Sequence, residues 1–190
     1  MIKVLLAGAA ALAFGADAWW AFAASTETSR KLLLEQGNVG FEKMQSVFAA
    51  IRLWGGGITP AYLAQGAASV AAIGCVAWMW RTSKDRELKA AALMIATLLA
   101  SPHVLDYDLT ILGPAMAFFV ASSWSNGFRD FDTTVLAATW IAPLLTRGIA
   151  GATGVPLGLI AIIALFALVI RHTMRDHANS AIGSPGIAQA

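Results

Sequence analysis

The chain has 190 residues, of which 58% are hydrophobic and only 13% are charged, and its formal net charge is +2. Soluble domains carry about twice that charged fraction, so the composition excludes an ordinary soluble domain and indicates an integral membrane protein. The small net charge and the lack of a basic run with interleaved aromatic residues argue against a nucleic-acid partner. The single cysteine, Cys75, lies in an apolar segment and excludes a disulfide framework.

Six apolar segments are predicted to be transmembrane helices, because a helix needs about 20 apolar residues to cross the hydrocarbon core. Some of the segments are short, which is tolerated where helices are broken or line a protein cavity. The expected spans are 5–24, 61–80, 88–100, 109–124, 133–145 and 155–170. The first span also has the outline of a signal peptide with an A-x-A site at 21–23, but Asp17 and the pair Trp19-Trp20 favour a true span.

The placement of lysine and arginine predicts the orientation of these spans. The loop 81–89 is rich in cations, which favours a cytoplasmic position for it and for both termini. Residues 25–60 and 101–108 are then expected outside. The tail 176–190 is polar and contains glycine and proline, so we expect it to be disordered in the cytoplasm.

The outer segment 25–60 is predicted to contain an amphipathic helix that lies in the membrane plane. Between two glycine-rich stretches, apolar residues recur at helical spacing, namely Phe41, Met44, Val47, Phe48 and Ile51. The segment carries more cations than an outer loop usually holds. Either these cations meet an anionic partner, or they pair with Glu27, Glu35 and Glu42 on a solvated face.

Residues 101–108 (Ser-Pro-His-Val-Leu-Asp-Tyr-Asp) interrupt an apolar stretch with groups that are costly inside a bilayer. Asp108 directly precedes the apolar run from Leu109, so capping of that helix is its expected structural role. Asp106 has no such role and is the better candidate for binding. His103 could contact a phosphate or a sugar hydroxyl, or form a structural hydrogen bond. Tyr107 could stack on a sugar or anchor at the headgroup level.

Four stretches in the same order resemble the C-terminal half of glycosyltransferase family 87, a group of polytopic enzymes in the GT-C superfamily that is also known as a domain of unknown function. They are 41–52 (FEKMQSVFAAIR), 61–65, 98–102 and 106–108, and the resemblance covers most of residues 10–170. His103 stands where an aromatic residue is expected in the family. The resemblance implies an all-α, partial GT-C-like bundle over residues 1–175. It also implies transfer of a hexose, often mannose, from a polyprenyl-phosphate donor at the outer face of the bacterial inner membrane.

The resemblance further implies a binding site for this donor, but no catalytic residue in the chain. Lys43 and Arg52 could pair with the lipid phosphate through charge-assisted hydrogen bonds. Other side chains that could bind the sugar or the phosphate are Gln45, Ser46, Tyr62, Gln65, His103, Asp106, Tyr107 and Asp108. Family members are much longer and place a catalytic aspartate in an earlier outer loop. The chain is therefore expected to be a truncated C-terminal portion that needs a missing N-terminal half.

Two classes of function stay open at this point. One is a membrane hexosyltransferase, and the other is a non-catalytic membrane protein: a lipid-carrier binding or transport component, or an inert remnant. The polar groups cluster at one surface and not along a pathway, which favours chemistry on lipid headgroups. No metal or other cofactor is expected, because the D-x-D pattern at 106–108 lacks the surrounding βαβ pattern of metal-dependent glycosyltransferases.

Overall fold

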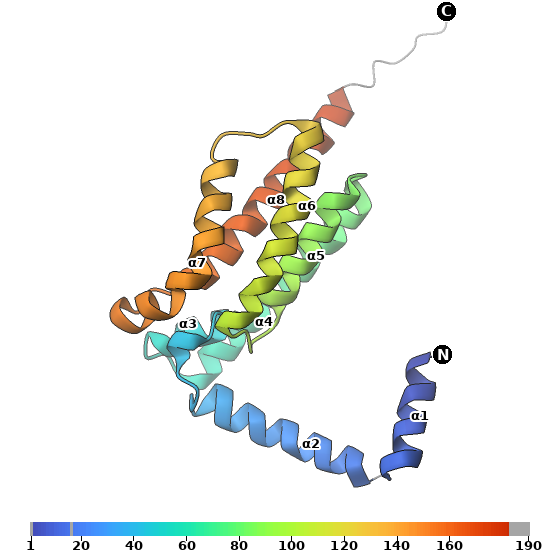
Figure 1. Cartoon of the computed structure of the whole chain (residues 1–190), viewed down its shortest axis with the longest axis vertical. Helices are drawn as coiled ribbons and strands as arrows, with labels where there is room; N and C mark the ends of the chain where they lie inside the picture. The colour runs from blue at the N-terminus through green and yellow to red at the C-terminus, as the bar shows by residue number, and fades with distance from the viewer. Residues whose placement is uncertain (1, 16, 183–190) are drawn as a thin grey trace, which may run out of the picture. The chain divides into compact units, whose positions relative to one another are not determined.

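The computed structural model describes residues 2–15 and 17–182. Over these residues the regular secondary structure is helical, apart from an isolated β-bridge between Met44 and Leu105. The chain forms two compact units, residues 1–40 and 41–190 (Figure 1). The all-helical fold class predicted from the composition is confirmed for the described part of the chain.

The first unit contains α1 (Ile2–Phe14), α2 (Asp17–Ser29) and the π-helical segment η1 (Arg30–Glu35). The span predicted over 5–24 is not confirmed as one continuous helix, because α1 and the helix that follows it are bent by 104°. Gly15, which ends α1, has a φ of 81° that glycine adopts without steric cost.

Ion pairs within the first unit explain part of its excess of cations. Arg30 pairs with Glu27 at 2.7 Å and also with Glu35, and Lys31 pairs with Glu27 at 3.3 Å. Of the two interpretations of the outer cations, mutual pairing with acidic residues therefore holds for Arg30 and Lys31. The candidates for an anionic partner that remain in segment 25–60 are Lys43 and Arg52.

The second unit is a helical bundle with short helices at one end (Figure 1). Helix α5 packs against α4, α6 and α8, and its apolar face is buried at Leu88 and Ile95. The elements in chain order are η2 (Phe41–Lys43), α3 (Val47–Leu53), α4 (Ile58–Thr82), α5 (Arg86–Ala100), η3 (Asp106–Ile111), α6 (Leu112–Asn126), α7 (Asp132–Thr153) and α8 (Leu157–Ile182).

Among the described residues, three helices are long and apolar enough to cross a membrane: α4, α7 and α8 over Leu157–Arg175. The bent pair in the first unit would be a fourth if it formed one broken span. Helices α5 and α6 have 15 residues each, or about 22 Å at 1.5 Å per residue, which is short of a core about 30 Å thick. Six full spans are therefore not confirmed, although a helix covers most of each segment predicted beyond residue 60.

Both of the last two helices are longer than predicted. Helix α7 runs through Gly148 and Gly151 and ends at Gly154, whose left-handed φ of 72° is typical of a helix C-terminus. Helix α8 continues to Ile182, so the part of the predicted disordered tail up to this residue is helical. The remainder of that tail, 183–190, lies outside the described residues.

The continuous amphipathic helix predicted between the glycine-rich stretches is broken in the structure. η2 ends at Lys43, and α3 begins only after Ser46, whose side chain accepts the N–H of Ala49 at 3.1 Å as an N-cap. Met44 and Phe48, which belong to the predicted apolar stripe, are buried. The stripe therefore serves protein packing, since α3 packs against α4, and a helix lying in the membrane plane is not confirmed.

Candidate functional site

The two segments predicted to form the outer site lie side by side at one end of the second unit. The backbone N–H of Gln45 donates to the carbonyl oxygen of Val104 at 2.7 Å, next to the antiparallel bridge between Met44 and Leu105. This pairing places Lys43 close in the fold to the segment that begins at Asp106. The structure thus joins two stretches that the sequence separates by about sixty residues.

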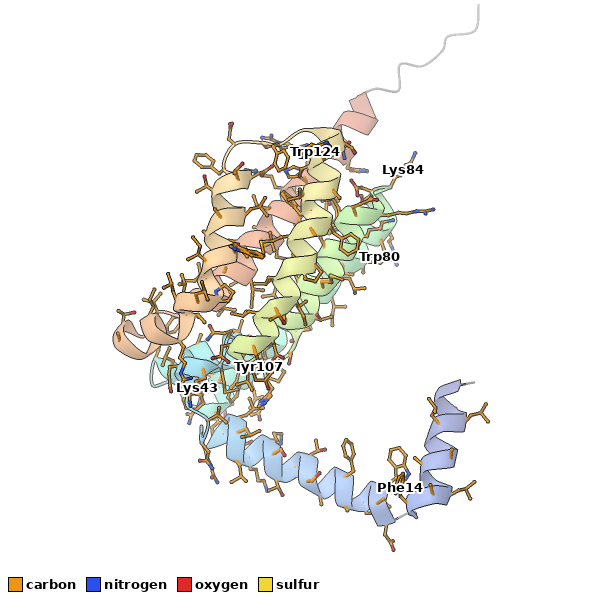
Figure 2. All side chains as sticks on the ribbon, in the orientation of Figure 1. Phe14, Lys43, Trp80, Lys84, Tyr107 and Trp124 are labelled. Carbon is orange, nitrogen blue, oxygen red and sulfur yellow. The ribbon has the colours of Figure 1, made fainter. Side chains whose placement is uncertain are left out.

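The side-chain view separates this end from the cationic loop 81–89. In Figure 2, Lys43 and Tyr107 lie at one end of the bundle, while Lys84 and Trp124 lie at the opposite end. The two groups therefore lie at opposite ends of the bundle, and the side of the membrane that each faces stays a prediction.

Three of the predicted binding residues are buried and hold the end of the bundle together: Gln45, Ser46 and Gln65. The amide oxygen of Gln65 accepts the N–H of Phe48 at 3.1 Å, and its amide nitrogen donates to the carbonyl oxygen of Leu99 at 2.9 Å. Gln65 therefore connects α3 with α4 and α5. Ser46 caps α3, as described above. These side chains shape the site from within.

Gln45 makes a similar connection to the last two helices. Its amide oxygen accepts the hydroxyl proton of Thr146 at 2.8 Å, and the Thr146 hydroxyl accepts the backbone N–H of Gly158 at 2.8 Å. The Gln45 side chain also lies so close to Gly158 that an added Cβ there would be 2.5 Å from the amide oxygen. The segment that carries Lys43 is thereby fixed to α7 and α8. The following residue on α7, Arg147, is exposed and adds a third cation at this end.

The predicted cation Arg52 is held in a defined position. Its Nη1 donates to the carbonyl oxygen of Gly56 at 2.8 Å, and its guanidinium lies 5.1 Å from the centre of the Phe41 ring. Both contacts leave the positive charge in place, and a stacked guanidinium keeps its planar fork of donors. Tyr62 packs against the buried Phe48, with ring centres 4.7 Å apart.

Asp108 is not the N-cap of a helix that begins at Leu109, as predicted, but the third residue of a 3-10 helix whose N-cap residue it contacts. Its carboxylate accepts the N–H of Leu105 at 2.9 Å. The helix concerned is the short 3-10 helix η3, which begins at Asp106 and not at Leu109. The carboxylate is therefore committed to holding the chain at the start of η3.

The other candidates from 101–108 lie at the surface or at its edge. The carboxylate of Asp106 accepts the N–H of Tyr107 at 3.0 Å and lines a cavity between α6 and α7. The Tyr107 side chain is 65% exposed, so its ring is free of the core. His103 is half-buried, and its backbone N–H donates to the hydroxyl of Ser101 at 3.2 Å.

A buried charged cluster at the opposite end of the bundle was missed by the sequence analysis. Asp132 is fully buried and accepts hydrogen bonds from the backbone N–H of Arg129 at 2.8 Å and from Arg171 at 2.5 Å. The Nε2 of His172 lies 2.8 Å from the same carboxylate. The sequence signals for this cluster were Asp132, directly before the apolar segment 133–145, and the pair Arg171-His172, directly after the segment 155–170. The cluster ties the start of α7 to α8.

The sequence analysis also missed a polar pocket beside Asp85. Asp85 caps α5 by accepting the N–H of Leu88 at 2.9 Å, and it accepts the hydroxyl of Ser122 at 2.6 Å. It borders an open cavity of about 690 Å³ with Lys84 and His177. Within residues 2–15 and 17–182, no group of three or more histidine, cysteine or acidic side chains could hold a metal ion.

Comparison with known proteins decides the family. The model of glycosyltransferase family 87 matches residues 1–102, which is just over half of the chain. The chain belongs to glycosyltransferase family 87. The matched range includes the stretches 41–52, 61–65 and 98–102, while 106–108 lies beyond it. No curated protein and no solved structure gives a match.

Membership in glycosyltransferase family 87 agrees with the helical architecture. The family suggests a membrane glycosyltransferase that uses a sugar donor, and α4, α7 and α8 have the length and apolarity of membrane helices. The matched residues include Lys43, Arg52 and the buried glutamines that hold their end of the bundle.

Proposed function

We propose that the end of the bundle that carries Lys43, Arg52 and Tyr107 binds the donor of a hexosyl transfer. The donor is a polyprenyl-phosphate-linked hexose, with mannose as the expected sugar. The site faces the outer side of a bacterial inner membrane, and both chain termini are cytoplasmic. The observation that carries the proposal is the pairing of Met44 with Leu105, which brings the cationic segment and the segment 101–108 into one surface.

Charge supports the assignment of the lipid phosphate to this surface. Lys43, Arg52 and Arg147 belong to elements that meet at the same end of the bundle. A phosphate at the headgroup plane forms charge-assisted hydrogen bonds with such cations, and a fixed guanidinium loses little entropy on binding.

The sugar is proposed to lie over the exposed ring of Tyr107, with His103 at the rim of the site. An exposed aromatic ring presents an apolar face to the C–H groups of a sugar, and its hydroxyl remains available for hydrogen bonding. The buried side chains of Gln45, Ser46 and Gln65, together with Tyr62, act from below by fixing the segments that carry the cations.

The test is donor affinity in the whole chain reconstituted in lipid nanodiscs. A hydrogen bond to a charged group is worth about 1.5–3 kcal/mol, and Lys43 is partly exposed to solvent, so we expect Lys43→Ala to weaken binding of polyprenyl-phosphate-mannose about tenfold. Arg52→Gln is expected to act in the same direction. The matched control is Lys84→Ala at the opposite end of the bundle (Figure 2), which should leave the affinity unchanged.

Wild-type affinity in the Lys43→Ala variant, or equal losses for Lys43→Ala and Lys84→Ala, would refute the donor site. A second measurement is transfer of the labelled hexose to a membrane acceptor. Transfer by the 190-residue chain identifies a transferase and contradicts the expectation that the catalytic base is supplied from outside this sequence. Donor binding without transfer agrees with that expectation and also with a lipid-carrier binding protein.

A further inference from the structure

A groove lies between α6 and α7, and its lining includes neither Lys43 nor Arg52 nor Tyr107 of the proposed donor site. It forms a cavity of about 360 Å³, within the size range of small-molecule sites. Apart from Asp106 and two threonines, its lining is apolar, with Leu109, Met116, Trp140 and Leu144 among the residues. Helices α6 and α7 share far fewer contacts than α7 and α8, so the groove stays open along the bundle surface.

One polar side chain in this groove has no hydrogen-bond partner. Thr139 is 1% exposed and lines the cavity, and its Oγ1 forms no hydrogen bond with any described residue. Threonine in a helix usually donates to a carbonyl one turn earlier. A buried hydroxyl without a partner is costly, most of all in a membrane where water cannot replace it.

The backbone carbonyl oxygen of Thr139 is a second group that lacks its usual hydrogen-bond donor. Pro143 lies inside α7, four residues after Thr139, and also lines the groove. Proline has no N–H, so it cannot donate to the carbonyl oxygen of Thr139. Thr139, a lining residue of the otherwise apolar groove, therefore has an unpartnered hydroxyl and a carbonyl oxygen that lacks its usual helical donor. A pure hydrocarbon chain would satisfy neither group, whereas a hydroxyl group can meet both and an ester carbonyl can meet the hydroxyl.

The mouth of the groove selects the headgroup. Asp106 lines the cavity, and its carboxylate uses one oxygen for the Tyr107 N–H. A carboxylate repels a bare phosphate and attracts an ammonium group. The polyprenyl-phosphate donor fits this groove poorly, because its isoprenoid chain has no polar group for Thr139 and its phosphate would meet Asp106. A glycerolipid with ester groups and an ammonium group at the end of a zwitterionic headgroup fits both positions.

We propose that the groove between α6 and α7 binds a phosphatidylethanolamine-type glycerolipid, separate from the sugar donor. One acyl chain lies along Met116, Trp140 and Leu144, an ester carbonyl accepts the hydroxyl proton of Thr139, and the ammonium group pairs with Asp106. The site does not depend on the donor assignment, because it uses neither Lys43 nor Arg52.

The test uses photoactivatable lipids with the whole chain in nanodiscs and no sugar donor present. Phosphatidylethanolamine and phosphatidylglycerol, each with a diazirine in one acyl chain, are crosslinked separately, and the labelled peptides are identified by mass spectrometry. Gly113→Leu fills the groove, since an added Cβ at Gly113 meets nothing within 4 Å. Gly66→Leu is the matched control, because Gly66 on α4 is equally open and lies away from the groove.

We expect phosphatidylethanolamine to label α6 and α7 around Trp140 much more than α4, and Gly113→Leu to remove most of this labelling while Gly66→Leu does not. Thr139→Val should reduce labelling about 2- to 10-fold, the value of one hydrogen bond, and Thr139→Ser should restore it. Thr139→Val leaves the empty protein at least as stable, because the lost hydroxyl has no protein partner. Asp106→Asn should abolish the preference for phosphatidylethanolamine over phosphatidylglycerol.

Three results would overturn the proposal. They are equal labelling of α4 and the groove, labelling that persists in Gly113→Leu, and displacement of the probe by polyprenyl phosphate as effectively as by unlabelled phosphatidylethanolamine. The last result would assign the groove to the donor lipid. Loss of donor binding in Lys43→Ala with unchanged lipid labelling would show that the two sites are separate.

Discussion

Substitution of Gly158 by alanine tests how firmly Gln45 fixes the donor-binding segment. The added Cβ would lie 2.5 Å from the Gln45 amide oxygen and 2.9 Å from its Cδ. Gln45 cannot turn away freely, because that oxygen accepts the Thr146 hydroxyl and the side chain is buried. Either the clash persists or the hydrogen bond breaks.

The magnitude follows from these two costs. Overpacking of a buried site costs about 1–3 kcal/mol, and a buried polar group that loses its partner costs about 1–3 kcal/mol. Alanine recovers up to about 1 kcal/mol relative to glycine within a helix. Because one cost or the other applies, we expect Gly158→Ala to lower the free energy of unfolding by up to about 3 kcal/mol, and by about 1–3 kcal/mol relative to the same change at an open helical glycine.

The assay is reversible denaturation of the whole chain in detergent micelles, followed by circular dichroism. The matched control is Gly74→Ala in α4, where an added Cβ meets nothing within 4 Å. This control should be neutral, or stabilising by up to about 1 kcal/mol. Equal stability of Gly158→Ala and Gly74→Ala would refute the close packing of Gln45 against α8.

Two further substitutions probe the fold with the same denaturation assay. Asp132→Asn removes the buried negative charge that Arg171 and His172 share. Breaking such a buried pair should lower the free energy of unfolding by about 3 kcal/mol or more. An unchanged free energy of unfolding would contradict the role of this cluster in joining α7 to α8. Ser46→Ala removes the side-chain cap on the Ala49 N–H and should cost about 0.5–2 kcal/mol, while Ser46→Gly should cost only a few tenths of a kcal/mol.

The positions of the long helices could be predicted because they depend on local composition. Runs of apolar residues identified α4, α5, α6, α7 and α8 within a few residues at most ends. The main exceptions are the C-terminal ends of α7 and α8. Glycine disfavours a helix, but α7 continues through Gly148 and Gly151. An added Cβ at Gly151 would lie 3.8 Å from the Glu42 side chain, so this glycine sits where η2 approaches α7.

The parts of the site that could not be predicted depend on contacts between distant segments. Periodicity alone predicts one helix through Met44, but the pairing of Gln45 with Val104 draws this stretch out of a helix. The same holds for the burial of Gln45 and Gln65, whose partners lie on other helices. Local signals did indicate that Asp108 contacts a nearby helix start, although that start is Leu105 and not Leu109, and that Tyr107 lies at the surface.

The central claim is that the segment of Lys43 and the segment of Tyr107 form one donor site, and a double-mutant cycle on donor affinity tests it most directly. Affinities for polyprenyl-phosphate-mannose are measured for wild type, Lys43→Ala, Tyr107→Ala and the double variant in nanodiscs. If both residues contact one bound donor, the two losses should differ from additivity by more than about 0.5 kcal/mol. Losses that add within about 0.3 kcal/mol, or no loss in either single variant, would contradict a shared site.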